Sequence, residues 1–515
     1  MAKPRKPLPN APAAESAAPD IQRNYDEIPY PTHPNDSAQP DRMAVVATLR
    51  GLKPAPVGRC RVLEVGCGDG SNLLSIAAMH PGSECVGLDL SGEAIARGLA
   101  LAAEAGIANV RLIAADLRQV DESWGSFDYI IAHGLYSWVP PDVRRALLQL
   151  IRGRLSEQGV ALVSYNAMPG GHFRRGLREM MFFHLRETEA PQERVDEAKA
   201  LMQLVTAAEL PGLNGFQAML AEQAQLIAER TDADLFHDEL SPINESFYFT
   251  EFLRRTGEYG LQYVGEAEWF TTNVERAGPL VAQALAPLAE ADPILKEQYL
   301  DFVTCRMFRK TLLCRSEAEL HWNPEARDIA GFWASSDAVA EAPDADGRQR
   351  FASAAAGTLT TADVRARAVM AGLQAAQPGA VAFSALVDAA MAASAEESRF
   401  KCATHVANFL VSAYGAGVIE LFTQPPHLVR APGERPIASP LARAQTSRGD
   451  DLTTLRHTEV AVSDAVGKAL IGLLDGTRDR AELLAALQAG PAPEETAEHL
   501  ESKLRELGLL GLLLG

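Results

Sequence analysis

Residues 62–70 read VLEVGCGDG, a short apolar run that contains one acidic residue, Glu64, and ends in a glycine-rich turn. The residues that follow, SNLLSIAAMH, have the apolar spacing of a helix. In a strand, glycine turn and helix, the backbone can approach a nucleotide-like ligand closely, because glycine adopts dihedral angles that other residues avoid. The stretch therefore predicts a ligand site at the first turn of a βαβ unit, without selecting the ligand.

More apolar segments follow at the intervals of a doubly wound sheet, and helical patterns separate them. Alternating strands and helices predict βαβ units and a parallel sheet. A helix, a glycine turn and a further strand at 261–266 come after a long helical stretch, so residues 170–240 are expected to be a helical insertion or lid. The earlier strands are CVGLDL at 85–90, NVRLIAADL at 109–117, FDYIIAH at 127–133 and GVALVSYN at 159–166.

Acidic residues end the second and third of these strands. Asp89 lies about twenty residues after the glycines, where a carboxylate can accept hydrogen bonds from both hydroxyls of a ribose. Asp116 and Leu117 end the next strand. A nicotinamide site usually has the pattern G-x-G-x-x-G, but here Ser71 occupies the third glycine position. The motif instead closes one residue early, at Gly70.

The order of glycines, Asp89, Asp116 and the FDYIIAHG strand resembles the class I S-adenosylmethionine-dependent methyltransferases. The resemblance implies S-adenosyl-L-methionine as the cofactor and assigns a role to each matching position. The methionine end would be held by Glu64, Gly66, Cys67, Gly68 and Gly70, the ribose by Asp89 with its neighbour Leu90, the adenine edge by Asp116 and Leu117, and the methyl-donor side would be lined by His133.

Two further stretches narrow the family. Residues 24–34, NYDEIPYPTHP, and 134–141, GLYSWVPP, resemble a bacterial group that carries a methyltransferase regulatory domain and is similar to protein-lysine methyltransferases acting on outer-membrane proteins. In that group the N-terminal stretch folds over the donor pocket. The catalytic candidates, which could accept an amine hydrogen bond or act as a base, are Tyr25, Tyr30, His133, Tyr136 and Tyr165.

The leading functional hypothesis is N-methylation of a lysine in a protein by in-line displacement. A methyltransferase for a small molecule is the alternative in the same class. A catalytically silent module that binds the cofactor as a sensor or scaffold is the alternative from a different class. The sequence does not identify the methyl acceptor.

Composition limits the partners and the compartment. The 515 residues contain 48 Lys and Arg against 67 Asp and Glu, a formal net charge of −19. This balance counts against nucleic acid or an anionic membrane as the main partner and is compatible with a basic substrate. Six cysteines without zinc-ligand spacing predict no metal and a reducing cytoplasm. No apolar run is long enough to span a membrane, and a homodimer is possible.

Five regions are expected along the chain. The fold class predicted is α/β, a Rossmann-like doubly wound sheet with a helical insertion, followed by mainly α, winged-helix-like C-terminal domains. Residues 280–325 are predicted to be helical, with the basic patch VTCRMFRKTLLCR at 303–315 inside them. The regions are a disordered tail at 1–20, a methyltransferase domain at 21–275, a helical middle or regulatory domain at 276–335, a winged-helix-like domain at 350–430 and a small α/β domain at 440–515.

Overall fold

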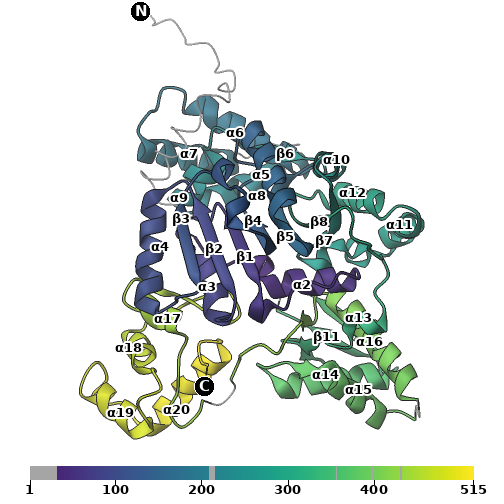
Figure 1. Ribbon diagram of the computed structural model, residues 1–515, viewed down its shortest axis with the longest axis vertical. Coiled ribbons are helices and arrows are strands. Elements are labelled where there is room, and N and C mark those ends of the chain that lie inside the picture. The colour runs from purple at the N-terminus through teal and green to yellow at the C-terminus, as the bar shows by residue number, and fades with distance from the viewer. Residues whose placement is uncertain (1–31, 208–214, 355–356, 396–397, 430–431, 515) are drawn as a thin grey trace, which may run out of the picture.

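Eight strands form the central sheet of the computed structural model, which describes residues 32–207, 215–354, 357–395, 398–429 and 432–514 (Figure 1). The strand order is β3-β2-β1-β4-β5-β8-β7, and β6 pairs with β5. The predicted tail at 1–20 lies outside the described residues. The strands are β1 Arg61–Val65, β2 Glu84–Asp89, β3 Val110–Ala114, β4 Phe127–Ala132, β5 Leu155–Ala167, β6 Ser246–Phe247, β7 Leu261–Glu266 and β8 Phe308–Arg315.

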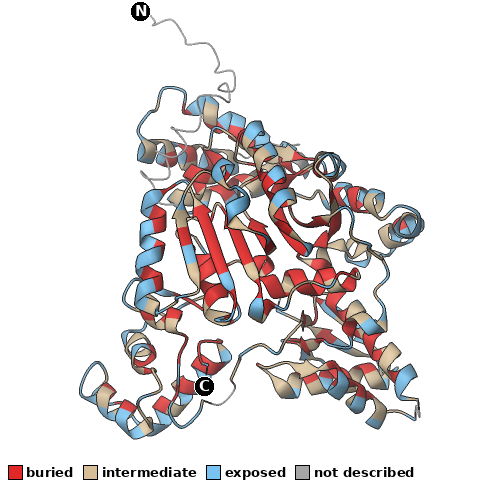
Figure 2. Cartoon of the chain, viewed as in Figure 1, coloured by how far each residue is buried: buried red, intermediate tan, exposed pale blue. Residues whose placement is uncertain are grey.

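Helices cover both faces of this sheet. Strands β1 to β5 run parallel, and β8 runs antiparallel to both β5 and β7. Alternate strand residues enter two hydrophobic cores, one shared with α2, α3 and α4 and the other with α5 and α10. The strands are accordingly the most continuously buried part of the chain (Figure 2), which confirms the doubly wound α/β class. These helices are α2 Pro40–Leu49, α3 Ser71–Met79, α4 Gly92–Ala105, α5 Pro141–Arg154 and α10 Phe249–Gly257.

The helical prediction for residues 280–325 holds as far as Thr304 but was wrong for Phe308–Arg315, which form a strand. Helix α12, Pro293–Thr304, ends at Cys305, which has a left-handed φ of 48°. The chain then forms β8 and inserts between β5 and β7. The basic residues of FRKTLLCR are not typical of a buried strand. Arg309 can face inward only because buried carboxylates neutralise its charge. The expected middle domain at 276–335 is therefore partly a strand of the central sheet.

The insertion after β5 is a helical layer with a hydrophobic core of its own. It lies beyond the carboxyl ends of the parallel strands, at the top of Figure 1. Its elements are α6 Gly171–His184, α7 Pro191–Thr206, α8 Gly215–Ala228, α9 Asp232–Asp234 and the π-helical turn η6 Leu235–Glu239. Helix α11, Pro279–Ala291, precedes α12, and the short 3-10 turns are η2 Asp36–Ala38, η3 Val57–Arg59, η4 Leu117–Gln119, η5 Glu122–Trp124, η7 Trp269–Thr272 and η8 Val274–Ala277.

A helical unit with small sheets follows the central domain and packs directly on it. Three helices of ten or more residues accompany a three-stranded sheet ordered β13-β9-β14. One continuous core joins α2 and Trp269 to Leu410 and Tyr414 of this unit. Its elements are α13 Ala326–Ile329, β9 Trp333–Ser335, β10 Val339–Ala340, β11 Gln349–Ala352, β12 Thr358–Thr361, α14 Val364–Ala376, β13 Val381–Ala382, α15 Phe383–Ala392, α16 Arg399–Gly415 and β14 Glu420–Phe422.

The C-terminal unit docks against α4 at the lower left of Figure 1, whereas the middle unit lies at the lower right. Leu441 and Ala444 of α17 pack on Leu101 of α4, and Arg448 forms an ion pair of 2.6 Å with Glu104. Within residues 455–490 the sequence pattern predicts one strand and two helices, and the structure has one strand and two helices there. The unit as a whole has a two-stranded hairpin and four helices. They are α17 Pro440–Gln445, β15 Asp451–Thr453, β16 Glu459–Ala461, α18 Ala465–Leu473, α19 Arg480–Gln488 and α20 Ala497–Leu509.

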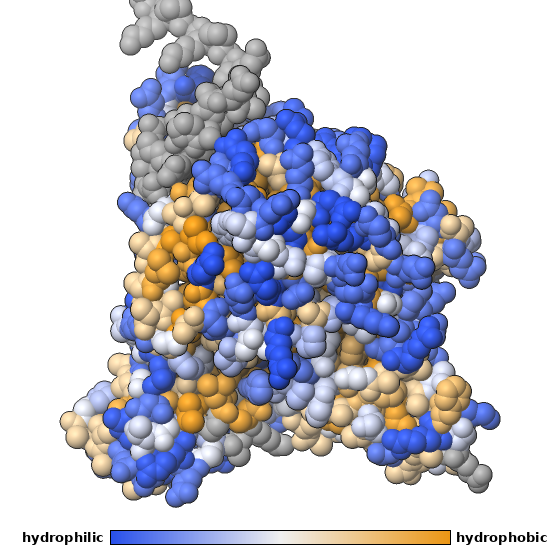
Figure 3. All heavy atoms as spheres, in the orientation of Figure 1, coloured by the Kyte–Doolittle hydropathy of each residue, from blue (hydrophilic) through white to orange (hydrophobic). Residues whose placement is uncertain are grey.

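The outer surface is mixed in character. Hydrophilic side chains cover most of the middle and right of the face in Figure 3, with smaller hydrophobic areas between them. Among the described residues, no helix combines the length and the apolar character needed to cross a membrane.

Candidate active site

Two adjoining cavities lie at the carboxyl ends of β1 to β4. Their volumes are about 650 Å³ and 520 Å³, and both are lined by Gly66, Asp89 and Leu90. The larger cavity contains Glu64, the glycine turn and His133, and the insertion helices form its outer wall. The smaller contains Asp116 and Leu117. The sheet therefore brings the residues predicted for the two ends of one ligand into neighbouring spaces.

The glycine turn presents its backbone to the larger cavity. Gly66, Gly68 and Gly70 have φ angles of 74°, 58° and 79°. A Cβ atom at Gly68 would come within 2.4 Å of Thr32 Cγ2, so no side chain fits there without moving the N-terminal segment. The amides of Gly66 and Cys67 donate to Leu88 O, at 2.8 Å and 3.1 Å, which ties the turn to the end of β2.

Glu64 is a buried carboxylate with one oxygen to spare. Its Oε1 accepts a hydrogen bond of 2.9 Å from Asn72 Nδ2, whereas Oε2 is buried without a hydrogen-bond partner. Burial raises the pKa of this carboxyl to about 8, against the smaller lowering effect of the Asn72 bond. A buried, unpartnered oxygen of this kind is costly, and a positively charged donor group in the cavity would satisfy it.

Asp89 lies at the end of β2, as the sequence indicated. Its two oxygens accept hydrogen bonds from the backbone amides of Gly68 and Ser91, both at 2.9 Å. Burial raises the pKa of the carboxyl, and these amides oppose that shift. Each oxygen keeps a lone pair for a further donor such as a hydroxyl. Leu90 is 44% exposed and offers an apolar surface beside the carboxylate.

Asp116 and Leu117 line the smaller cavity. Asp116 caps η4 and forms an ion pair of 2.6 Å with Arg118, a hydrogen-bonded contact that lowers the pKa of the carboxyl. The carboxylate therefore remains charged at neutral pH and is partly occupied by the arginine. Leu117 is buried and forms an apolar wall next to it.

His133 ends β4 and is buried as a neutral ring. Asn35 Nδ2 lies 2.8 Å from its Nε2, and burial lowers its pKa to about 4, with Lys310 adding to the effect. An amide NH2 group donates, so this contact places the ring hydrogen on Nδ1, which is buried without a partner. The ring is better suited to donate a hydrogen bond to a ligand than to remove a proton.

Tyr136 and Tyr165, predicted as catalytic, lie in the core instead. They are 1% and 0% exposed and contact each other, Phe247 and Phe252 at the second face of the sheet. Tyr165 accepts a hydrogen bond of 3.3 Å from Thr311 Oγ1, and Tyr136 bonds with Arg255. Neither lines the cavity, because their positions point to the opposite face. Tyr25 and Tyr30 lie outside the described residues.

Several cavity residues were missed by the sequence reasoning. Trp138 belongs to the quoted GLYSWVPP loop, so its place after the fourth strand was the available signal. Met307 and Phe308 enter from β8, where a helix was predicted, and Phe308 packs edge-on against His133 with ring centroids 6.0 Å apart. Asn35 and Asn72 could not be predicted as cavity residues, because nothing in the sequence around an isolated asparagine shows which distant residues it contacts.

The outer wall of the cavity is charged and internally paired. Arg174 of α6 bonds Glu239 at 2.7 Å, and Arg230 bonds Asp238 at 2.8 Å. Burial raises the pKa of the Asp238 carboxyl. Arg174 also lies 6.0 Å from the centroid of the ring of Trp138, which lines the same cavity. Within the described part of the chain, no group of His, Cys, Asp and Glu side chains could hold a metal ion.

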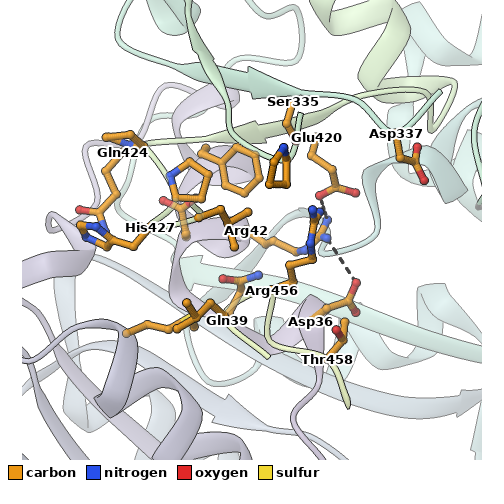
Figure 4. A pocket seen from close by; sticks show the side chains of 18 of the residues that line it. Asp36, Gln39, Arg42, Ser335, Asp337, Glu420, Gln424, His427, Arg456 and Thr458 are labelled. Carbon is orange, nitrogen blue, oxygen red and sulfur yellow. Dashed lines mark hydrogen bonds and ion pairs between the residues drawn. The ribbon is translucent and has the colours of Figure 1, made fainter. Parts of the chain in front are cut away.

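A separate cavity of about 410 Å³ lies where the central domain meets the middle and C-terminal units (Figure 4). In it Arg42 pairs with Glu420 at 2.6 Å and with Asp36 at 3.2 Å. Arg456 and Thr458 of the C-terminal hairpin enter the same space. The cavity therefore sits behind the N-terminal segment that closes the larger ligand cavity.

Three family models match the chain. One described as a methyltransferase domain matches residues 62–159, and one described as a predicted methyltransferase regulatory domain matches residues 231–315. One described as the C-terminal winged helix domain of PKMT matches residues 434–503. The regulatory match includes β7 and β8, so part of it completes the central sheet. The winged-helix match falls where the sequence predicted a small α/β domain, after the winged helix expected at 350–430.

Relatives and solved structures extend the similarity beyond single domains. RP028 of Rickettsia prowazekii (strain Madrid E) is 35% identical over 232 residues, 45% of this chain and 93% of that protein. RP789 of the same organism is 33% identical over 319 residues, which are 62% of this chain and 57% of that protein. PKMT2 from Rickettsia typhi in complex with AdoHcy matches with 24% identity and a TM-score of 0.83, covering 95% of this chain and 100% of that one.

Proposed function

Because this chain belongs to the bacterial family that joins a class I methyltransferase domain to a predicted methyltransferase regulatory domain, we propose that it is an S-adenosylmethionine-dependent methyltransferase that N-methylates a lysine of a protein. The cofactor site is the cavity pair at the carboxyl ends of β1 to β4. PKMT2 from Rickettsia typhi, which has a similar fold, was solved in complex with AdoHcy, and this supports the choice of cofactor. The acceptor enters from the side of the insertion helices.

One observation carries the cofactor assignment. The Oε2 atom of Glu64 is buried, unpartnered and next to a glycine turn that leaves room for backbone contacts. The α-ammonium group of S-adenosylmethionine is a donor of the right charge for it. His133 Nδ1 offers a complementary donor toward the α-carboxylate, and Asp89 accepts from the ribose hydroxyls. The residues present therefore fit the amino-acid and nucleoside parts of this cofactor.

The chain's own residues would align the reactants. Bound in this cavity, S-adenosylmethionine supplies a methyl group activated by its sulfonium charge. The glycine turn and Asp89 fix the position of the donor, and the insertion helices exclude water from the reacting space. The acceptor amine needs only alignment and loss of one proton to solvent, which a low-dielectric, cationic neighbourhood favours by lowering its pKa. A strong base is not required, in keeping with a neutral His133.

A lysine acceptor suits the surroundings of the cavity. Trp138 and Phe308 offer aromatic faces, which attract alkylated ammonium groups. The net charge of −19 favours the approach of a basic protein surface. In this proposal Trp138 and Phe308 contact the acceptor amine, a role that the sequence analysis assigned to Tyr136 and Tyr165. A small-molecule acceptor would also fit a cavity of this size, so the acceptor is decided by experiment.

Five of the six cysteines are buried and the sixth, Cys305, is partly exposed, and none of them is paired with another in a disulfide. Free thiols persist where reductants keep them reduced, and this supports a cytoplasmic location in the proposal.

Calorimetric titration of the full chain with S-adenosylmethionine tests the cofactor assignment. We expect saturable binding, and Asp89→Ala should weaken it about 10- to 100-fold, the usual cost of losing hydrogen bonds to a charged group. Glu93→Ala is the matched control, because Glu93 is an exposed acidic residue at the start of α4. Absence of binding to the parent chain would overturn the proposal. If Asp89→Ala and Glu93→Ala weakened S-adenosylmethionine binding equally, Asp89 would not be the residue that binds the ribose.

The acceptor is tested by incubating the enzyme and a lysate with donor labelled in the methyl group. Label in protein that is recovered as methyllysine after acid hydrolysis supports the lysine proposal. If label entered only small molecules, the lysine proposal would be rejected in favour of a small-molecule methyltransferase. Donor binding without transfer to either fraction would favour the sensor or scaffold.

A further inference from the structure

One asparagine in the cofactor site is held by three separate parts of the chain. Asn72, in the first turn of α3, donates from Nδ2 to Glu64 Oε1 at 2.9 Å. Its Oδ1 accepts from the Asn35 backbone amide at 2.9 Å and contacts His457 Nε2 at 2.7 Å. Two donors bind the side-chain oxygen of Asn72, and this fixes the orientation of the amide so that its NH2 group faces Glu64.

His457 reaches this asparagine from the C-terminal unit. It lies in the turn between β15 and β16, and it is 0% exposed. Its Nδ1 lies 2.7 Å from Ser75 Oγ, one turn further along α3. Because a carbonyl oxygen only accepts, Nε2 carries the hydrogen toward Asn72 and Nδ1 accepts from the serine. One neutral imidazole therefore bridges two consecutive turns of the helix that follows the glycine motif.

The backbone at His457 is bent to allow this contact. Its φ angle is 61°, one of two positive values among the described residues that are not glycine. A side chain in that conformation is strained, and such strain persists where the surroundings require it. A glycine or asparagine would relieve the turn but would not carry an imidazole to Asn72. The conformation is therefore explained by the position of the side chain.

The same hairpin also holds the N-terminal segment over the cavity. Glu459 Oε2 lies 2.6 Å from His33 Nδ1, and this contact is the largest cause of the raised pKa of His33. His33 is followed by Pro34 and Asn35, and Asn35 bonds both Asn72 and His133. The hairpin therefore reaches the site by two routes, one through α3 and one through the segment at Thr32–Asn35.

We propose that His457 is a positioning residue of the cofactor site: the C-terminal winged-helix domain, through this side chain, fixes the amide of Asn72 and thereby directs Glu64 at the cofactor. The inference rests on the proposed function, and it assigns that domain a share in donor binding. Anything that pulls the hairpin away from α3 would free Asn72 to rotate and would weaken binding of S-adenosylmethionine without touching the cavity.

The neighbouring residue supplies a matched control. Arg456 belongs to the same turn, but its side chain enters the separate cavity between the domains, near Arg42 and Glu420 (Figure 4). Arg456→Ala therefore disturbs the hairpin equally close to His457 and leaves the bond to Asn72 in place. His457→Gln is the conservative variant, because the glutamine amide can donate from about the position of Nε2.

The experiment measures S-adenosylmethionine binding by calorimetry for the full-length parent and the three variants, with thermal unfolding as the check of folding. We expect the dissociation constant to rise about tenfold for His457→Ala, to stay within about twofold for Arg456→Ala and to recover most of the affinity for His457→Gln. Unchanged binding by His457→Ala, or equal weakening by both alanine variants, would overturn the proposal.

Hydrogen exchange of the variants separates this inference from the proposed function. In the absence of any ligand, His457→Ala should speed amide exchange between residues 64 and 76, and Arg456→Ala should not. A parent chain that binds no S-adenosylmethionine would remove the proposed function, yet the exchange pattern would still show whether His457 orders the glycine turn. Protection that is the same in both variants would refute the positioning role by itself.

Discussion

At the scale of single residues, Glu64 is poised to respond to a cation. Its pKa is raised to about 8 by burial, above its usual 4.5. The carboxyl is therefore mostly protonated at neutral pH in the free protein. The ammonium group of S-adenosylmethionine would favour the charged form, because an opposite charge close by lowers a carboxyl pKa. Ligand binding and proton release are thus coupled at this one side chain.

We predict that S-adenosylmethionine binding at pH 7 releases close to one proton from Glu64. The measurement is calorimetry in buffers with different ionisation enthalpies, where the observed heat should change linearly with the buffer. Glu64→Gln should bind more weakly and show no dependence on the buffer. A parent protein whose heat is independent of the buffer would contradict the raised pKa. By linkage, the contribution of this group to stability is present below pH 4.5 and is lost as the pH rises toward 8.

Trp138 gives a test of the acceptor side of the cavity. Its ring lines the larger cavity, as Phe308 does, and its centroid lies 6.0 Å from the Arg174 guanidinium. We predict that Trp138→Ala lowers kcat/KM for methyl transfer about tenfold, since cation–π contacts contribute about 1–2 kcal/mol when desolvated. Trp138→Phe should keep most of the activity. Donor affinity, measured by calorimetry, should be unchanged in both, and a matching loss of donor affinity would place the ring at the cofactor instead.

At the scale of elements, β8 owes its place in the sheet to a buried arginine. Arg309 is 0% exposed and pairs with Glu266 at 2.6 Å, Asp301 at 2.7 Å and Glu297 at 3.2 Å. Arg306 and Lys296 provide further cations for Asp301 and Glu297. The positive and negative charges of this cluster balance, which lets a charged strand occupy the interior.

We predict that Arg309→Met destabilises the fold by about 3–5 kcal/mol, the cost of leaving buried carboxylates without their partner. The free energy of unfolding in urea measures the effect. Arg254→Met removes an exposed pair with Glu258 in α10 and should cost less than about 1 kcal/mol. Losses of similar size in the two variants would show that the buried cluster is not what stabilises β8.

Elements whose own residues show the pattern of a strand or helix could be predicted from the sequence. Elements that depend on contacts with residues far along the chain could not. Strands β1 to β5 are apolar runs, and β1, β2 and β3 lead into glycines or carboxylates, so these strands and the place of Glu64, Asp89 and Asp116 at the carboxyl edge of the sheet follow from the chain itself. Strand β8 has basic residues whose partners come from β7 and α12. Tyr136 and Tyr165 were assigned to the cavity because sequence position does not show which face of the sheet a residue enters.

At the scale of the whole molecule, three histidines are buried as neutral rings in different contacts. Burial lowers the pKa of His80 and His133 to about 4 and that of His457 to about 3, from an ordinary value of 6.5. Protons bind these rings more tightly in the unfolded chain. Their contribution to stability is therefore present above pH 6.5 and is lost as the pH falls through the folded pKa values.

His80→Asn should make the stability of the chain less sensitive to acid. His80 lies at the junction of the central domain with the loop at Gln424, which it contacts at 3.2 Å. We predict that the parent loses thermal stability more steeply than the variant between pH 6.5 and pH 4. Melting temperatures across that range measure the difference. If the melting temperatures of parent and variant changed with pH in parallel, folding would not lower the pKa of the His80 ring.

The contact between His457 and Asn72 joins residues 385 positions apart. A ribosome synthesises the glycine motif before the hairpin, so a nascent chain that already displays residues 62–159 still lacks the donor that sets the amide of Asn72. Full affinity for the methyl donor is therefore acquired only after the hairpin has been synthesised and has docked on α3. Chains that stop short of the hairpin would carry the sequence motif of the family and would bind the methyl donor only weakly.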